Sequence, residues 1–242
     1  DEALGNREPA RLHYSAGSVG FGVNRRVIKD GTWTGFGVNP TGPVDHDLPM
    51  ITVRRTDGSI RAVWLGYACH GVCWQKPSFH GDWMGTAQRL IEANHPGVVS
   101  LITIGCAGDQ NPAISEGNEV DIPAREIAVE VERLLAAPQL SLAGPPEVRL
   151  KRLSLPLANK EEFYDWSKQK DWFSRTVFEK QNRGEPVAST IPYVVQTWTF
   201  ADDLAVVFLA GEVTAGYGLR LKRELAAGRV WQMKVRGGRL TV

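Results

Sequence analysis

The sequence of 242 residues is long enough for one large domain or two small ones, and its 43% hydrophobic and 23% charged residues are ordinary for a globular protein. Its net charge is +1, without a dense block of Lys and Arg, which argues against nucleic acid as the main partner because phosphate binding needs clustered positive charge. No apolar run reaches the roughly 18 residues that a membrane-spanning helix needs.

The N-terminus and the cysteines say little about the cellular compartment. The opening stretch "DEALGNREPARLHY" lacks the basic and apolar regions of a signal peptide, so none is predicted in this chain. Three cysteines (Cys69, Cys73 and Cys106) give no disulfide framework, although one Cys69–Cys73 bridge is an option. The sequence gives no indication of the oligomeric state.

Strand patterns alternate with helix patterns along the chain, which predicts an α/β fold: a mixed β-sheet flanked by helices, with long Gly/Pro-rich loops. The loops are expected at 17–47, where Gly, Pro, Asn and Asp are frequent. The other expected elements follow in chain order. A hairpin of strands 49–55 and 60–69 around Asp57-Gly58 is followed by a helix over 81–97 with Asp82 as its N-cap, a strand over 98–105 covered on both faces, and a helix over 121–138 with Asp121 as its cap. A strand over 145–157, a charged and aromatic helix over 160–182, a hairpin of strands 193–200 and 204–211 around Asp202-Asp203, and a helix over 214–225 complete the chain.

Three of the apolar strands are followed by polar residues of types that can bind a metal or take part in catalysis. The first is followed by "ACHGVCW" with His70, the second by "GCAGDQNP" with Asp109 and Asn111, and the third by "AGEVTAG" with Glu212. Ligands of open α/β sheets collect beyond the carboxyl ends of the strands, so the three ends are expected to share one pocket.

Each candidate also has a purely structural interpretation. His70 suits a zinc ion, but it also fits a buried, hydrogen-bonded histidine, and the nearby cysteines leave a compact Cys/His metal cluster as a third option. Glu212 suits a metal ligand or a general base, or simply the favourable dipole at the start of the next helix. Asp109 is counted with Arg25 and Asn111 among the candidate catalytic residues, and it is expected to brace the turn or to orient a metal ligand. Arg25 and Arg26 are candidates for binding a carboxylate or for polarising a carbonyl, and the structural alternative is that they are simply solvated.

The order of these motifs resembles the neutral/alkaline (non-lysosomal) ceramidase family over about residues 19–227. The matching segments are "GFGVNRR" for an Asn-Arg-Ser segment, "GPVDHDLPMITV" for a Val-Asp strand entry, "YACHGVCW" with "FHGDWMGTA" for Ala-x-His-Pro-Thr and Ser-Gly-Asp-x-x-Gly, "GCAGDQNP" for Gly-Asp-Val-Ser-Pro, and "FLAGEVTAGYGLRLKREL" for Pro-Gly-Glu-Phe-Thr. The interpretation divides the chain into an unassigned segment 1–18, a ceramidase-like core 19–228 and a divergent tail 229–242.

The resemblance implies a zinc amidohydrolase that splits the N-acyl amide of ceramide into sphingosine and fatty acid. It assigns His70 and Glu212 as zinc ligands and places Arg25 beside the amide oxygen, where a cation stabilises an oxyanion. It also implies a small lipid or amide substrate, contact with a membrane surface, and a secreted or periplasmic location. The aromatic stretch 160–182 is a candidate for lipid contact, although core packing is the commoner role of such a stretch.

The chain departs from the family in three places. No His-Thr-His segment, which would supply another zinc ligand and a catalytic His, precedes residue 19, and no tyrosine ligand follows Glu212 in the tail, so a chain truncated at both ends is expected. Asn111 stands where the family has a serine. Because an amide cannot be an acyl nucleophile, attack by zinc-activated water is expected, with Asn111 orienting water or substrate. The alternatives are the same scaffold acting on another amide or ester, or an inactive, incomplete fragment.

Overall fold

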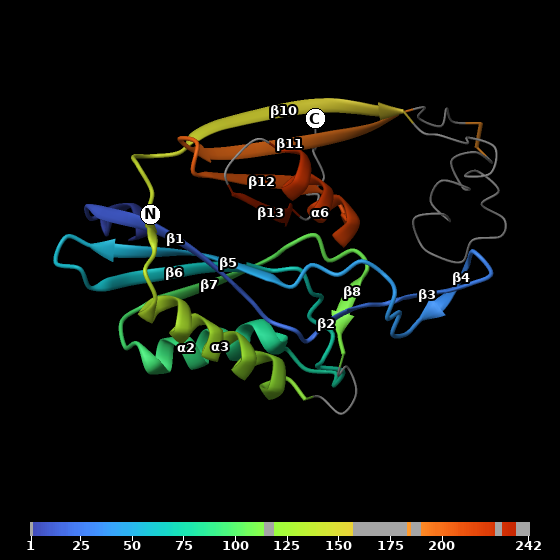
Figure 1. Cartoon of the computed structure of the whole chain (residues 1–242), viewed down its shortest axis with the longest axis horizontal. Coiled ribbons are helices and arrows are strands. Elements are labelled where there is room, and N and C mark those ends of the chain that lie inside the picture. Colours follow the sequence, from blue (N-terminus) through green and yellow to red (C-terminus); the bar gives the residue numbers. More distant parts are fainter. Residues whose placement is uncertain (1, 114–118, 157–182, 185–189, 226–228, 236–242) are drawn as a thin grey trace. The chain divides into compact units, whose positions relative to one another are not determined.

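The computed structural model describes residues 2–113, 119–156, 183–184, 190–225 and 229–235 (Figure 1). The chain divides into a larger unit, Asp1–Arg149 with Gln196–Val242, and a smaller unit, Leu150–Val195. A short helix α1 (Glu2–Gly5) opens the larger unit, and the fold is α/β, as the sequence predicts.

A five-stranded mixed sheet of order β7-β6-β5-β1-β9 forms the centre of the larger unit. The strand β5 pairs antiparallel with β1 and with β6, which confirms the predicted hairpin, and β6 runs parallel to β7. The strand β1 was not predicted. The strands are β1 (Ala10–Ser18), β5 (Asp47–Arg55), β6 (Ile60–Tyr67), β7 (Val99–Ile104) and β9 (Leu140–Ser141).

Two helices, α2 (Asp82–Asn94) and α3 (Asp121–Ala136), pack against each other on one face of this sheet (Figure 1). Their apolar faces are those the sequence predicts, with Ile91, Ile127 and Val131 fully buried in the main core. The predicted caps are wrong, because Asp82 and Asp121 are the first residues of the two helices. Gly81 and Val120 precede them as the N-caps, and neither forms a side-chain cap hydrogen bond.

The strand β7 does not have both faces covered, contrary to the prediction. It lies at the end of the sheet order, and Ser100 is buried while Val99 and Leu101 are exposed. The run of apolar residues was interpreted as a strand covered on both faces, whereas the residues at its start alternate between exposed and buried.

A second sheet has the order β10-β11-β12-β13, and the helix α6 (Ala215–Glu224) follows β12 as predicted. The strands are β10 (Glu147–Pro156), β11 (Thr190–Phe200), β12 (Leu204–Ala210) and β13 (Val230–Val235). A second core joins this sheet to the first within the larger unit, where Tyr14 and Ile51 pack with Phe200, Leu204 and Trp231.

The segment 229–235, which the sequence analysis assigned to a divergent tail, contributes a strand of this second sheet. The strand β13 pairs in parallel with β12, and Trp231 and Met233 are buried. The domain boundaries that were drawn at 18/19 and 228/229 stay predictions. The predicted helix 160–182 lies outside the described residues. No helix in the described ranges is long and apolar enough to cross a membrane.

The region 17–47 is more ordered than the predicted long loops. The strand β2 (Gly22–Asn24) pairs with β8 (Gln110–Pro112), and β3 (Arg26–Lys29) forms a ribbon with β4 (Thr32–Phe36). The ribbon turns at Asp30-Gly31, where both residues have positive φ angles of 50° and 75°. An Asp-Gly pair between short apolar segments is a hairpin signal, so this ribbon was detectable from the sequence.

Candidate active site

The three predicted strand ends meet in the larger unit. The amide of Gly105, after β7, donates to Tyr67 O at the end of β6 (3.0 Å). The amide of Gly108 donates to Val213 O (2.8 Å), which lies after β12. The stretch "GCAGDQNP" is therefore the link between the ends of both sheets.

Gly108 allows the segment that carries Glu212 to approach the turn closely. A Cβ atom on this residue would collide with the backbone carbonyl of Glu212, so only glycine allows the two backbones to lie this close. The glycine in the motif thus places Glu212 beside the turn that carries Asp109 and Asn111.

Arg25 reaches the same point through the β2–β8 pair. Its backbone amide donates to Asp109 O (2.8 Å). Its guanidinium donates to Asn111 Oδ1 (3.3 Å) and to Gly108 O (3.1 Å), and it lies 4.8 Å above the ring centre of Phe36. The side chain is 16% exposed, so it is held in place while one side stays open to solvent.

His70 is oriented by the backbone around it. Its Nδ1 lies 3.0 Å from Gln110 O, and its own carbonyl accepts a hydrogen bond from Trp83 Nε1 (2.9 Å). Because a carbonyl only accepts, Nδ1 carries the proton and the lone pair of the neutral ring is on Nε2. That atom lies 3.8 Å from Glu212 Oε2.

The carboxylate of Glu212 therefore faces both His70 and Arg25. The same atom, Oε2, is 3.9 Å from the Arg25 guanidinium. The Glu212 side chain is 62% exposed, so it can adjust to a ligand. An imidazole nitrogen, a carboxylate and a guanidinium thus converge on one partly open position.

Asp109 is 5% exposed, and both of its carboxylate oxygens accept hydrogen bonds from the scaffold. Oδ1 accepts from the amide of Ala215 at the start of α6 (2.7 Å), and Oδ2 accepts from Asn24 Nδ2 (3.1 Å). These contacts agree with the interpretation of Asp109 as a brace, because both carboxylate oxygens accept hydrogen bonds from the scaffold.

Three residues that the sequence analysis did not single out support the turn through hydrogen bonds: Asp45, Gln110 and Lys222. Gln110 is fully buried, and its Oε1 accepts from the amide of Asp45 (2.6 Å). The carboxylate of Asp45 in turn accepts from Lys222 Nζ at 2.6 and 2.7 Å. Gln110 lies inside the motif and was available as a signal, whereas nothing in the sequence links Lys222 to Asp45.

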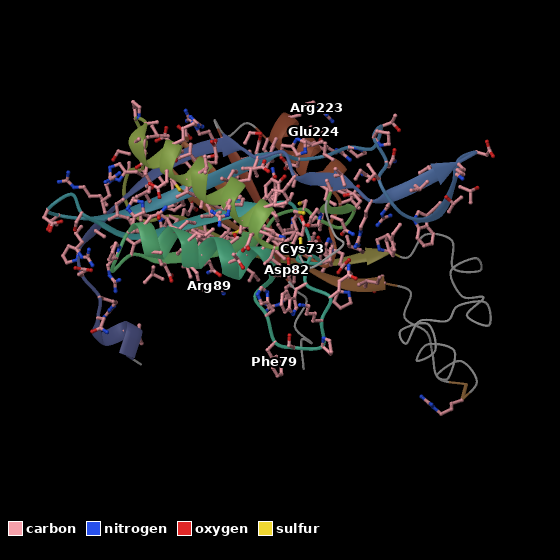
Figure 2. All side chains as sticks on the ribbon, turned by 90° about the horizontal axis from the view of Figure 1, so that it is seen from below. Cys73, Phe79, Asp82, Arg89, Arg223 and Glu224 are labelled. Atoms are coloured by element: carbon pink, nitrogen blue, oxygen red, sulfur yellow. The ribbon has the colours of Figure 1, made fainter. Side chains whose placement is uncertain are left out.

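The loop between His70 and α2 is tied down by Asp82. Its Oδ2 accepts from the amide of Trp74 (2.8 Å) and its Oδ1 from that of Trp83 (2.7 Å). Figure 2 shows Cys73 close to Asp82 and Phe79 at the tip of the loop. Asp82 therefore braces the His70 segment rather than capping α2.

Neither the compact Cys/His metal cluster nor the Cys69–Cys73 bridge, both of which the sequence left as options, is present in the described residues. All three cysteines lie in the described residues, and each is a buried thiol. Burial raises the pKa of Cys73 and of Cys106 to about 12, and the pKa of Cys69 is also well above its usual value. Without a bound metal, thiols with such pKa values are poor nucleophiles at neutral pH.

The described residues fit a zinc ion only in part. They contain no group of three His, Cys, Asp or Glu side chains placed to hold a metal. Two donors bound to one tetrahedral zinc lie about 3.3 Å apart, so His70 Nε2 and Glu212 Oε2, at 3.8 Å, need only a small adjustment. The pair fits as two of the three protein ligands that a catalytic zinc normally has.

A cavity of about 540 Å³ in the larger unit is lined by none of the residues Arg25, His70, Asn111 and Glu212. Tyr14, Asp47, Arg133 and Lys222 are among its lining residues. The candidate site is thus distinct from this hollow.

Comparison of the structure with solved proteins identifies the fold. The neutral ceramidase from Pseudomonas aeruginosa superposes with a TM-score of 0.63 at 14% identity, over 93% of this chain and 45% of that one. The chain has a ceramidase fold. A ceramidase complexed with C2 gives a TM-score of 0.68 at 14% identity, over 94% and 46% of the two chains.

The chain spans less than half the length of these ceramidases. No family model and no curated protein matches the sequence. The structural match supports the predicted α/β class and the resemblance at the level of the fold.

Proposed function

We propose that the chain is the core of a zinc-dependent amidohydrolase that acts on the N-acyl amide of ceramide-like sphingolipids and releases sphingosine and a fatty acid. The observation that carries the proposal is the convergence of His70 and Arg25 on one oxygen of Glu212 within a ceramidase fold.

His70 and Glu212 are assigned to the metal as two of its protein ligands. A bound zinc ion supplies Lewis acidity and lowers the pKa of water. The hydrogen bond from Nδ1 to Gln110 O holds the His70 ring with Nε2 toward Glu212, which is how ligating histidines are commonly oriented.

Arg25 is assigned to the substrate carbonyl. As water adds to the acyl carbon, negative charge develops on the carbonyl oxygen, and a fixed guanidinium stabilises it without rearrangement. The C–N bond then breaks, and the amine nitrogen takes up the proton that the added water has given up. The contacts of Arg25 with Asn111 and Gly108 supply the required rigidity.

A second candidate is the hydrolysis of a different amide or an ester on the same scaffold. Asn111 favours it, because this residue stands at the position where the resemblance expects a serine, and its Oδ1 contacts Arg25. A changed side chain next to the carbonyl-binding cation would alter which acyl compounds fit.

The test is the release of fatty acid from N-acyl-sphingosine by the wild-type chain and by His70→Ala, with short-chain amides and esters run in parallel. His95→Ala is the matched control, since His95 binds Glu132 between α2 and α3. The proposal expects that His70→Ala abolishes release while His95→Ala retains it. Turnover of only the short compounds supports the second candidate, and no turnover of any compound by zinc-loaded wild-type chain overturns both.

A further inference from the structure

The β3–β4 ribbon carries large apolar side chains that are not packed into either core. Ile28 is 49% exposed, Trp33 54% and Phe36 69%, and Val38, just beyond the ribbon, is 59% exposed. Single exposed apolar residues are ordinary, whereas a contiguous group on one short element marks an interaction surface.

The pairing of the two strands places these residues on one face. Ile28 lies opposite Trp33, and Arg26 lies opposite Phe36. Side chains of directly opposed residues share a face of a ribbon. A register shift between Val27 and Ile28 brings Trp33 and Phe36 into edge-to-face contact, with their ring centres 5.6 Å apart. We call Ile28, Trp33 and Phe36 the ribbon face.

The ribbon face is continuous with the candidate active site. The Arg25 guanidinium lies over the ring of Phe36, so one surface of this ring supports the residue that is assigned to the substrate carbonyl. Exposed cations accompany the apolar side chains, since Arg26 opposes Phe36 and Lys29 lies next to Ile28 near the turn. Asp30 is the only acidic side chain in the ribbon from Arg26 to Phe36.

We propose that the ribbon face docks on the surface of a lipid bilayer and places the Arg25–Glu212 site against it. Aromatic side chains suit the boundary between headgroups and acyl chains, and cations near them are attracted to anionic headgroups. The choice of a lipid surface over a protein partner rests on the proposed function, because a substrate with long apolar chains resides in a bilayer.

The test is flotation of the protein with phosphatidylcholine vesicles that contain or lack phosphatidylserine. Ile28→Ser/Trp33→Ser removes two exposed apolar side chains and leaves Phe36 beneath Arg25. The matched control is Ile122→Ser/Val129→Ser on α3, where the side chains are 49% and 70% exposed. Lys29→Glu reverses one charge at the ribbon.

The proposal expects wild type and the α3 variant to float equally, and the ribbon variant to bind at least about ten-fold more weakly. It expects Lys29→Glu to lose binding mainly to the vesicles with phosphatidylserine. Equal flotation of the ribbon variant and wild type, or no flotation of wild type, overturns it.

Hydrolysis of a soluble short-chain amide separates this proposal from the proposed function. Hydrolysis by wild type without vesicle binding refutes the ribbon proposal alone. Vesicle binding that depends on Ile28 and Trp33, without any hydrolysis, refutes the proposed function and retains the lipid surface.

Discussion

His70 Nε2 lies 3.8 Å from Oε2 of Glu212, although the two residues follow strands of different sheets, β6 and β12, and lie in distant parts of the chain. The turn "GCAGDQNP" makes this proximity possible. Gln110 O holds the His70 ring on one side, and Gly108 admits the backbone of Glu212 on the other. The geometry of the pair is therefore a property of the turn.

Arg25→Lys should reduce the turnover number for N-acyl amides about 100-fold with little change in KM. Lysine keeps the positive charge but cannot contact Asn111 and Gly108 at the same time with a planar group, so the cation is no longer fixed. Steady-state kinetics test this, with Arg220→Lys on the exposed face of α6 as the control. Equal turnover by Arg25→Lys and wild type would contradict the assignment of Arg25 to the substrate carbonyl.

Gly108→Ala should lower the free energy of unfolding by about 1–3 kcal/mol, because the added methyl group meets the backbone carbonyl of Glu212. Urea denaturation measures the change. Gly216→Ala is the matched control, since nothing lies within 4 Å of a Cβ at this position in α6 and alanine favours the helix. A neutral Gly108→Ala would mean that the turn does not hold the Glu212 segment closely.

Asp109→Asn should lower the free energy of unfolding by about 2–3 kcal/mol. The new amide group would direct N–H donors at the Ala215 amide or at Asn24 Nδ2, both of which are donors in the native protein. Asp57→Asn, on an exposed turn, is the control for the loss of one negative charge. Denaturation curves that coincide for wild type and Asp109→Asn would contradict the bracing role.

The cysteines should react slowly with thiol reagents at about pH 8 in the native protein and rapidly in urea. Burial raises the pKa of Cys73 and Cys106 in the folded state to about 12, whereas in the unfolded chain these thiols ionise near their usual value. Stability should therefore be unaffected by these groups below about pH 8 and should fall as the pH rises above it, because only the unfolded state loses the protons. Rapid labelling of all three thiols in the native protein would contradict their burial.

The sequence predicted the α/β class of the fold and the proximity of the three strand ends. His70, Asn111 and Glu212 could be singled out because each follows an apolar strand, where ligands of α/β sheets collect, and their roles in chemistry stay predictions. The strands β2 and β8 were not recognisable, since three residues carry no periodic signal and their pairing joins distant segments.

Long-range contacts account for the other errors. Trp231 in β13 is buried because β13 pairs with β12 and because Trp231 packs in the second core, whereas the basic residues around it led to its interpretation as part of a divergent tail. The contact between Lys222 and Asp45 joins α6 to the loop before β5, which no local pattern indicates. The Asp30-Gly31 turn, in contrast, was a readable signal for the β3–β4 ribbon.

The central claim is zinc-dependent hydrolysis of an N-acyl amide at His70 and Glu212, and its most direct test is fatty-acid release from N-acyl-sphingosine before chelation, after chelation and after return of zinc. The account predicts that release disappears with the chelator, returns with zinc, and does not return in His70→Ala. Release that persists after complete removal of zinc, or a zinc-loaded wild-type chain that releases no fatty acid, would contradict it.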